Sequence, residues 1–122
     1  MDKALCLALG SLAGGFSRWL LTLAVSRAAG DRFPHGTFLV NMSGCFLIGL
    51  LHGLGDGRLV LGPRARMLLV VGFCGAFTTF STWILESSAM MDQGDFVPAV
   101  VYLGASLLLG LALFRAGAAL AS

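Results

Sequence analysis

The sequence predicts an all-α membrane protein that folds as a single four-helix transmembrane domain over residues 1–122. The mean hydropathy is +0.90, and only 11% of the residues are charged, against about 25% in soluble domains. The chain also holds apolar runs near the length of roughly 20 residues that a helix needs to cross a bilayer. Short links rich in Gly, Pro and Asp separate these runs,.

We expect the helices at about 4–26, 36–55, 67–90 and 96–120, with a break in the third near 75–80. Links as short as DQGD force neighbouring helices to run antiparallel and leave no room for an extramembrane domain,. Any function therefore lies inside the membrane.

The first predicted helix carries a deeply placed arginine. Arg18 lies about 13 Å of helix rise before Arg27,, so it is either a snorkelling side chain beside Trp19 or a cation near a polar pathway. Gly10 and Gly14 form a GxxxG motif, which permits close approach of another helix,.

The second predicted helix places Thr37 and Asn41 on one face, because they are four residues apart,. Asn41 is either a hydrogen-bonding contact between helices, worth about 0.6 kcal/mol on average, or a donor that lines a pore. In both interpretations its side chain faces protein or water.

The third predicted helix contains the stretch GFCGAFTTFSTW, Gly72–Trp83. Its glycines and hydroxyl residues weaken a helix, and non-helical backbone at membrane depth survives only where it is buried or lines a cavity. Freed carbonyls near Gly75 and Thr78 suit a hard cation such as Na⁺. The ring edges of Phe77, Phe80 and Trp83 suit a small anion.

The fourth predicted helix has a stripe formed by Tyr102, Ser106 and Gly110,. The stripe is either a packing groove or a line of hydroxyls along which an ion passes. Glu86, near the end of the third helix, is the only acid within any predicted span.

Several function classes are excluded. A net charge of +2 is too small and scattered to indicate nucleic-acid binding,, and no nucleophile–base pair or phosphate-binding loop indicates an enzyme. We interpret the cysteines as packing residues. Positive charge favours the side of the termini, with Lys3, Arg58, Arg64, Arg66 and Arg115 against Arg27 and Arg32,.

The stretch GFCGAFTTFSTW resembles the signature of the Fluc (CrcB) fluoride channels. GGFSRW (Gly14–Trp19) and GTFLVNMSGCFLIG (Gly36–Gly49) resemble that family's other two blocks in order and spacing. The resemblance implies a passive fluoride channel in the cell inner membrane, formed by an antiparallel, dual-topology homodimer with two pores and a central structural sodium ion. Because one four-helix chain is too thin to enclose a polar path, we expect a second copy on independent grounds.

The resemblance also implies roles for particular residues. The sodium ligands would be the backbone carbonyls of Gly75 and Thr78. Arg18 matches the arginine of the family's first block, and Trp83 stands where the family has the second phenylalanine of an aromatic pair. The fluoride path would use Asn41, Phe80, Ser81, Thr82, Tyr102 and Ser106, with Thr37 in support and Glu86 near a vestibule.

Two alternatives stay open. A non-transporting membrane assembly subunit would use its polar residues as contacts between helices, but it leaves the clustered TTFST without a reason,. A small proton-coupled multidrug exporter would require an acid deep in the first helix, where this chain has Arg18,.

Overall fold

The computed structural model describes residues 1–57 and 60–122, and within these ranges the regular structure is entirely helical. Helices long and apolar enough to cross a membrane cover Lys3–Ala29, His35–Asp56, Pro63–Asp92 and Phe96–Ala121. The predicted all-helical class with four candidate spans is therefore confirmed. Arg58, counted above among the positive charges, lies outside the described residues.

The first two helices are slightly longer than their apolar cores. Helix α1 (Lys3–Ala29) starts at the side chain of Asp2, whose Oδ1 accepts the backbone N–H of Leu5 at 2.7 Å,. It ends at Gly30, whose φ of +81° is readily adopted only by glycine,. Helix α2 (His35–Gly57) follows after a short turn.

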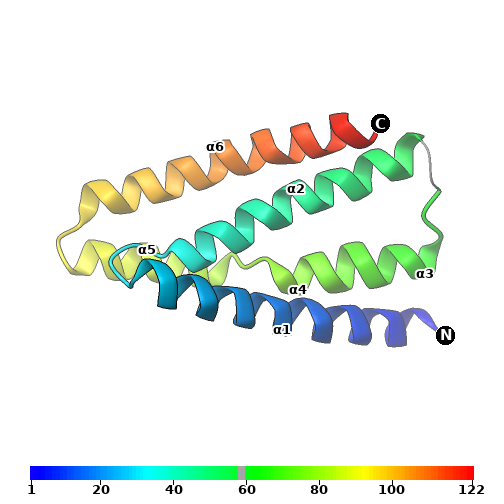
Figure 1. Ribbon diagram of the computed structural model, residues 1–122, viewed down its shortest axis with the longest axis horizontal. Helices are drawn as coiled ribbons and strands as arrows, with labels where there is room; N and C mark the ends of the chain where they lie inside the picture. The colour runs from blue at the N-terminus through cyan, green and yellow to red at the C-terminus, as the bar shows by residue number, and fades with distance from the viewer. Residues whose placement is uncertain (58–59) are drawn as a thin grey trace.

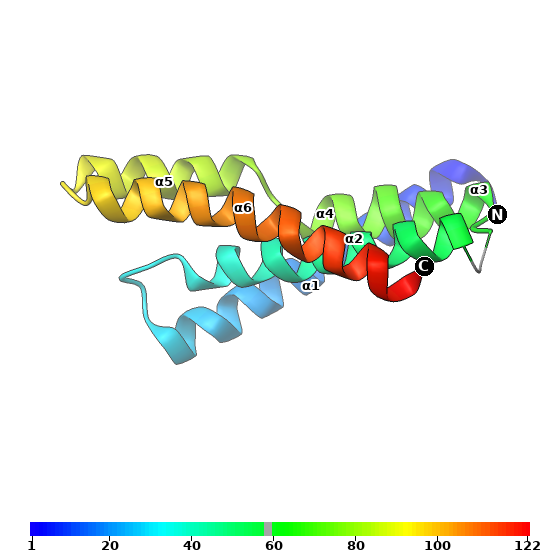
Figure 2. The ribbon, with the colours of Figure 1, turned by 90° about the horizontal axis from the view of Figure 1, so that it is seen from above.

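The third span consists of several helical pieces. Pro63 opens α3 (Pro63–Arg66), which leads into a π-helix, η1 (Met67–Cys74), and a last turn, α4 (Gly75–Phe77). Thr78–Phe80 lie outside any helix, and α5 (Ser81–Asp92) follows. Figure 2 shows the chain leaving the line of α4 at this point before α5 runs beside α6 (Phe96–Ala121).

Both chain termini lie at one end of the molecule, together with the last turn of α2 and the start of α3 (Figure 1). Helix α2 packs mainly on α6, and α1 packs mainly on η1. The spans thus form two close pairs, α2 with α6 and α1 with the η1 part of the interrupted third span.

Glycines bring the paired helices into backbone contact. A Cβ atom at Gly10 or Gly14 would collide with the backbone carbonyl of Leu68 or Phe73, and one at Gly49 would collide with that of Phe114. In lipid, helices associate largely through such close van der Waals packing. The GxxxG motif in α1 is therefore a packing surface for η1.

Candidate functional site

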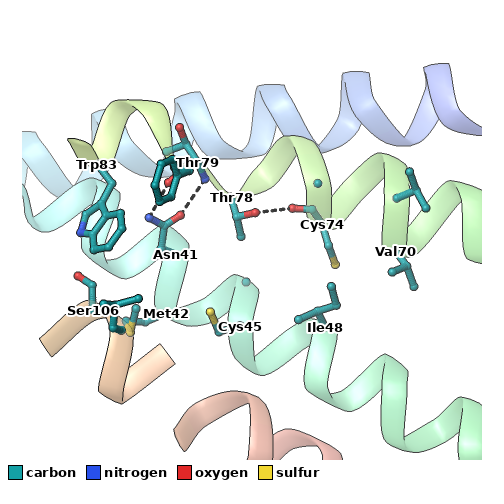
Figure 3. Close-up of a pocket in the computed structure, with 15 residues that line it drawn as sticks. Asn41, Met42, Cys45, Ile48, Val70, Cys74, Thr78, Thr79, Trp83 and Ser106 are labelled. Atoms are coloured by element: carbon teal, nitrogen blue, oxygen red, sulfur yellow. Dashed lines mark hydrogen bonds between the residues drawn. The ribbon is translucent and has the colours of Figure 1, made fainter. Parts of the chain in front are cut away.

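Asn41 on α2 holds the non-helical segment of the third span in place. Its Nδ2 donates to the carbonyl of Thr79 at 2.9 Å, and its Oδ1 accepts the backbone N–H of Thr79 at 2.8 Å (Figure 3). One side-chain amide thereby satisfies both backbone groups of a residue that has left the helix. We call this pair of hydrogen bonds the Asn41 latch.

Hydroxyl groups satisfy further backbone groups around the latch. Thr78 Oγ1 donates to the carbonyl of Cys74 at 2.9 Å, and Thr79 Oγ1 accepts the N–H of Thr82 at 3.3 Å, at the start of α5. Within the described residues, no hydrogen bond ends on the carbonyl oxygens of Gly75 and Thr78. Gly75 also has open space where a side chain would stand. Two backbone oxygens are thus available to another ligand.

A pocket of about 510 Å³, the first pocket, opens beside the latch (Figure 3). Much of its wall is apolar, from Met42, Ile48, Val70 and Leu107, and within residues 1–57 and 60–122 no charged side chain lines it. The residues predicted for the site that lie on its wall are Asn41, Gly75, Thr78, Phe80, Trp83 and Ser106.

A second pocket of about 240 Å³ has a different character. Arg18 and Glu86 both line it, so its wall carries one basic and one acidic side chain. The threonines on the same wall are Thr22, Thr37, Thr79 and Thr82. Because Thr79 lines both pockets, the latch lies at the boundary between them.

The carboxylate of Glu86 joins three helices. Its Oε1 accepts the hydroxyl of Thr37 on α2 at 2.6 Å, and its Oε2 accepts the hydroxyl of Tyr102 on α6 at 3.0 Å. Thr37 and Tyr102 are almost completely buried. The Thr37 hydroxyl therefore fixes one oxygen of Glu86, whose side chain lines the second pocket together with that of Arg18.

Two predicted path residues are not enclosed by the single chain. The side chain of Phe80 is 71% exposed although it borders the first pocket, and Ser81 is exposed and lines neither pocket. Tyr102 lines neither pocket but reaches the site through Glu86.

Sequence reasoning missed the position of Thr79 at the centre of the site. Its signal was its place inside TTFST, but residue spacing does not reveal that Asn41 would bond its backbone. The cysteines are partly as expected. Cys6 and Cys74 are buried, whereas Cys45 is half-buried, and both Cys45 and Cys74 line the first pocket.

Comparison with known proteins identifies the family. The family model described as CrcB-like protein, Camphor Resistance (CrcB), matches residues 5–118. This chain belongs to the CrcB-like family. The resemblance noted in the sequence is therefore confirmed across nearly the whole chain.

Individual members of the CrcB-like family are similar at moderate identity. A protein of Nitratidesulfovibrio vulgaris (strain Miyazaki F) is 44% identical over 117 residues, which cover 96% of this chain and 94% of that protein. One from Maridesulfovibrio salexigens is 42% identical, covering 98% and 95%, and one from Chlorobaculum tepidum is 43% identical, covering 99% and 95%. All three are named fluoride-specific ion channel FluC, which names a channel and not an enzyme.

Proposed function

We propose that this chain is the subunit of a passive, fluoride-selective ion channel that exports fluoride across the cell inner membrane. The observation that carries the proposal is near-full-length similarity to proteins named fluoride-specific ion channels. The arrangement of the site supports it, because the polar residues of four helices meet at an interruption in mid-span.

The donors along the proposed path suit a small anion. Fluoride is strongly hydrated, so its water must be replaced by close donors in a narrow passage. Arg18 supplies positive charge in the second pocket, and the hydroxyls of Thr82 and Ser106 lie on the walls of the two pockets. The Asn41 amide has two N–H groups, of which the latch uses one, so the other is free to face the ion,.

The proposed channel is an antiparallel, dual-topology homodimer with two pores. The exposed ring of Phe80 and the largely apolar first pocket support a second copy, since that copy would cover both. A path that runs along the contact between two identical chains occurs twice by symmetry. Ser81 would face the ion only in such an assembly.

A structural sodium ion fits the carbonyls of Gly75 and Thr78. Both oxygens are free of hydrogen bonds in the described structure, and oxygen is the donor that hard cations prefer,. Contributed by two chains, they would supply four oxygens at the axis between the copies. Bound there, the ion would hold the two interruptions against each other and would take no part in permeation.

Efflux from liposomes tests the proposed function. Vesicles loaded with potassium fluoride or potassium chloride receive a potassium ionophore, and ion-selective electrodes follow the anion. We expect fast fluoride loss that depends on the ionophore, with chloride retained. If folded, dimeric protein releases neither ion, the chain is not a channel, and the assembly-subunit interpretation replaces it.

A further inference from the structure

Two hydrogen-bonding groups on the wall of the first pocket have no partner. Trp83 is 7% exposed and Ser106 is 8% exposed, yet within the described residues neither Trp83 Nε1 nor Ser106 Oγ makes a hydrogen bond. A buried polar group left unpaired costs about 1–3 kcal/mol. Two such groups on one pocket indicate a ligand that both can bind.

The two groups come from helices in direct contact. The Trp83 ring on α5 packs edge-on against Tyr102 on α6, with ring centroids 6.5 Å apart and planes at 74°. Ser106 stands one helical turn after Tyr102, and residues four apart lie on the same helix face. Figure 3 accordingly shows Trp83 and Ser106 together at one end of the pocket.

The chemistry of the pair requires a ligand that accepts a hydrogen bond. An indole N–H can only donate a hydrogen bond, so it cannot bind a cation, and a serine hydroxyl donates as readily as it accepts. Much of the remaining wall is apolar, from Met42, Leu107 and Ile48, and no charged side chain among the described residues lines the pocket. Hydrogen bonds to a small anion are stronger in such surroundings than in water.

We propose that Trp83 Nε1–H and Ser106 Oγ–H form a two-donor site for fluoride that favours it over larger halides. The proposal rests on the channel function above and adds a donor that an aromatic hydrocarbon ring at position 83 would lack. Because the site contains neutral donors and no fixed cation, it binds weakly enough for the ion to leave.

Nuclear magnetic resonance of the indole groups tests this site directly. The chain has only two tryptophans, and Trp19, which is 60% exposed on α1, serves as an internal reference. With ¹⁵N-indole-labelled protein, we expect fluoride to move the Trp83 N–H proton downfield, while equal chloride moves neither signal. Trp83→Phe assigns the resonance.

Matched serine variants test the second donor. Ser106→Ala should raise the fluoride concentration that produces half of the full Trp83 N–H shift by about tenfold. This is the effect expected when a hydrogen bond to a charged group is lost. Ser87→Ala is the control, because the Ser87 hydroxyl donates to the Trp83 carbonyl at 2.7 Å and does not line the pocket. We expect this variant to titrate like the unmodified chain.

Three results would overturn the donor pair. The first is a Trp83 N–H signal that does not move at fluoride concentrations that support efflux. The second is a half-maximal fluoride concentration that is unchanged in Ser106→Ala, and the third is an equal Trp83 shift with chloride. Efflux measured on the same preparation separates the two proposals. Fluoride efflux with a fixed Trp83 signal leaves the channel standing without the donor pair. A fluoride-dependent shift without efflux retains the site and removes the channel.

Discussion

Asn41 has a structural task in this chain, and the proposed channel assigns the same side chain a second role as a donor in the pore. Its amide group forms hydrogen bonds with both the N–H and the carbonyl of Thr79. One N–H of the amide stays available, so a contact between helices and a donor role in a pore are compatible. Substitution of a residue with both roles should change stability and transport together. Its presence on α2 was visible in the sequence, but its partner was not, because the partner is backbone and carries no residue-type signal.

We predict that Asn41→Ala lowers both fluoride efflux and the free energy of unfolding. The substitution leaves the N–H and carbonyl of Thr79 without partners, and a buried unpaired group costs about 1–3 kcal/mol. Asn41→Asp should keep the bond from the Thr79 N–H and set a carboxylate against the Thr79 carbonyl, so its efflux should also fall. Thermal unfolding in detergent and liposome efflux measure the two effects.

Ser43→Ala is the matched control on the same helix. The Ser43 hydroxyl donates only to carbonyls of its own helix, those of Leu39 at 2.7 Å and Val40 at 3.1 Å. Its removal should therefore change neither quantity appreciably. If Asn41→Ala unfolds at the temperature of Ser43→Ala, the latch does not stabilise the interruption.

At the scale of helices, the expected spans and those of the structure differ by a few residues at their ends. We expected spans at 4–26 and 67–90, and the structure has Lys3–Ala29 and Pro63–Asp92. The helices extend further because they begin at the Asp2 cap and at Pro63, which lie outside the apolar runs. The π-helical turns of Met67–Cys74 had no signal in the sequence, since MLLVVGFC is compatible with an ordinary α-helix. Local composition thus indicates where a candidate span lies better than it indicates the type of helix within the span.

We predict that Gly14→Ala destabilises the protein and that Gly15→Ala does not. A Cβ at Gly14 would collide with the Phe73 backbone, whereas one at Gly15 meets no atom within 4 Å. Overpacking of this kind costs about 1–3 kcal/mol. Gly15→Ala should unfold at an equal or higher temperature, since alanine favours the helix. Equal melting of the two variants in detergent would show that α1 does not rest on η1 through this motif.

At the scale of the whole molecule, a single chain gathers most of the predicted site residues but does not enclose a path. The resemblance selected residues from all four spans, and the structure distributes them between two pockets that meet at Thr79. That division could not be predicted from the sequence, because it depends on which side of the interruption each side chain lies. Phe80 and Ser81 stay exposed, and the second copy of the proposed dimer would cover them.

The proposed dimer predicts that Gly75 of one chain lies beside Gly75 of its partner. If both chains give the Gly75 carbonyl to one sodium ion, single cysteines introduced there, with Cys6, Cys45 and Cys74 replaced by alanine, should cross-link in membranes. Phe16→Cys in the same background is the control, because Phe16 is exposed on α1 and lines no part of the first pocket. We expect a covalent dimer on gels for Gly75→Cys only, formed faster in sodium than in a large organic cation. Cross-linking at Phe16 with none at Gly75 would place the second copy against α1 and remove the shared cation site.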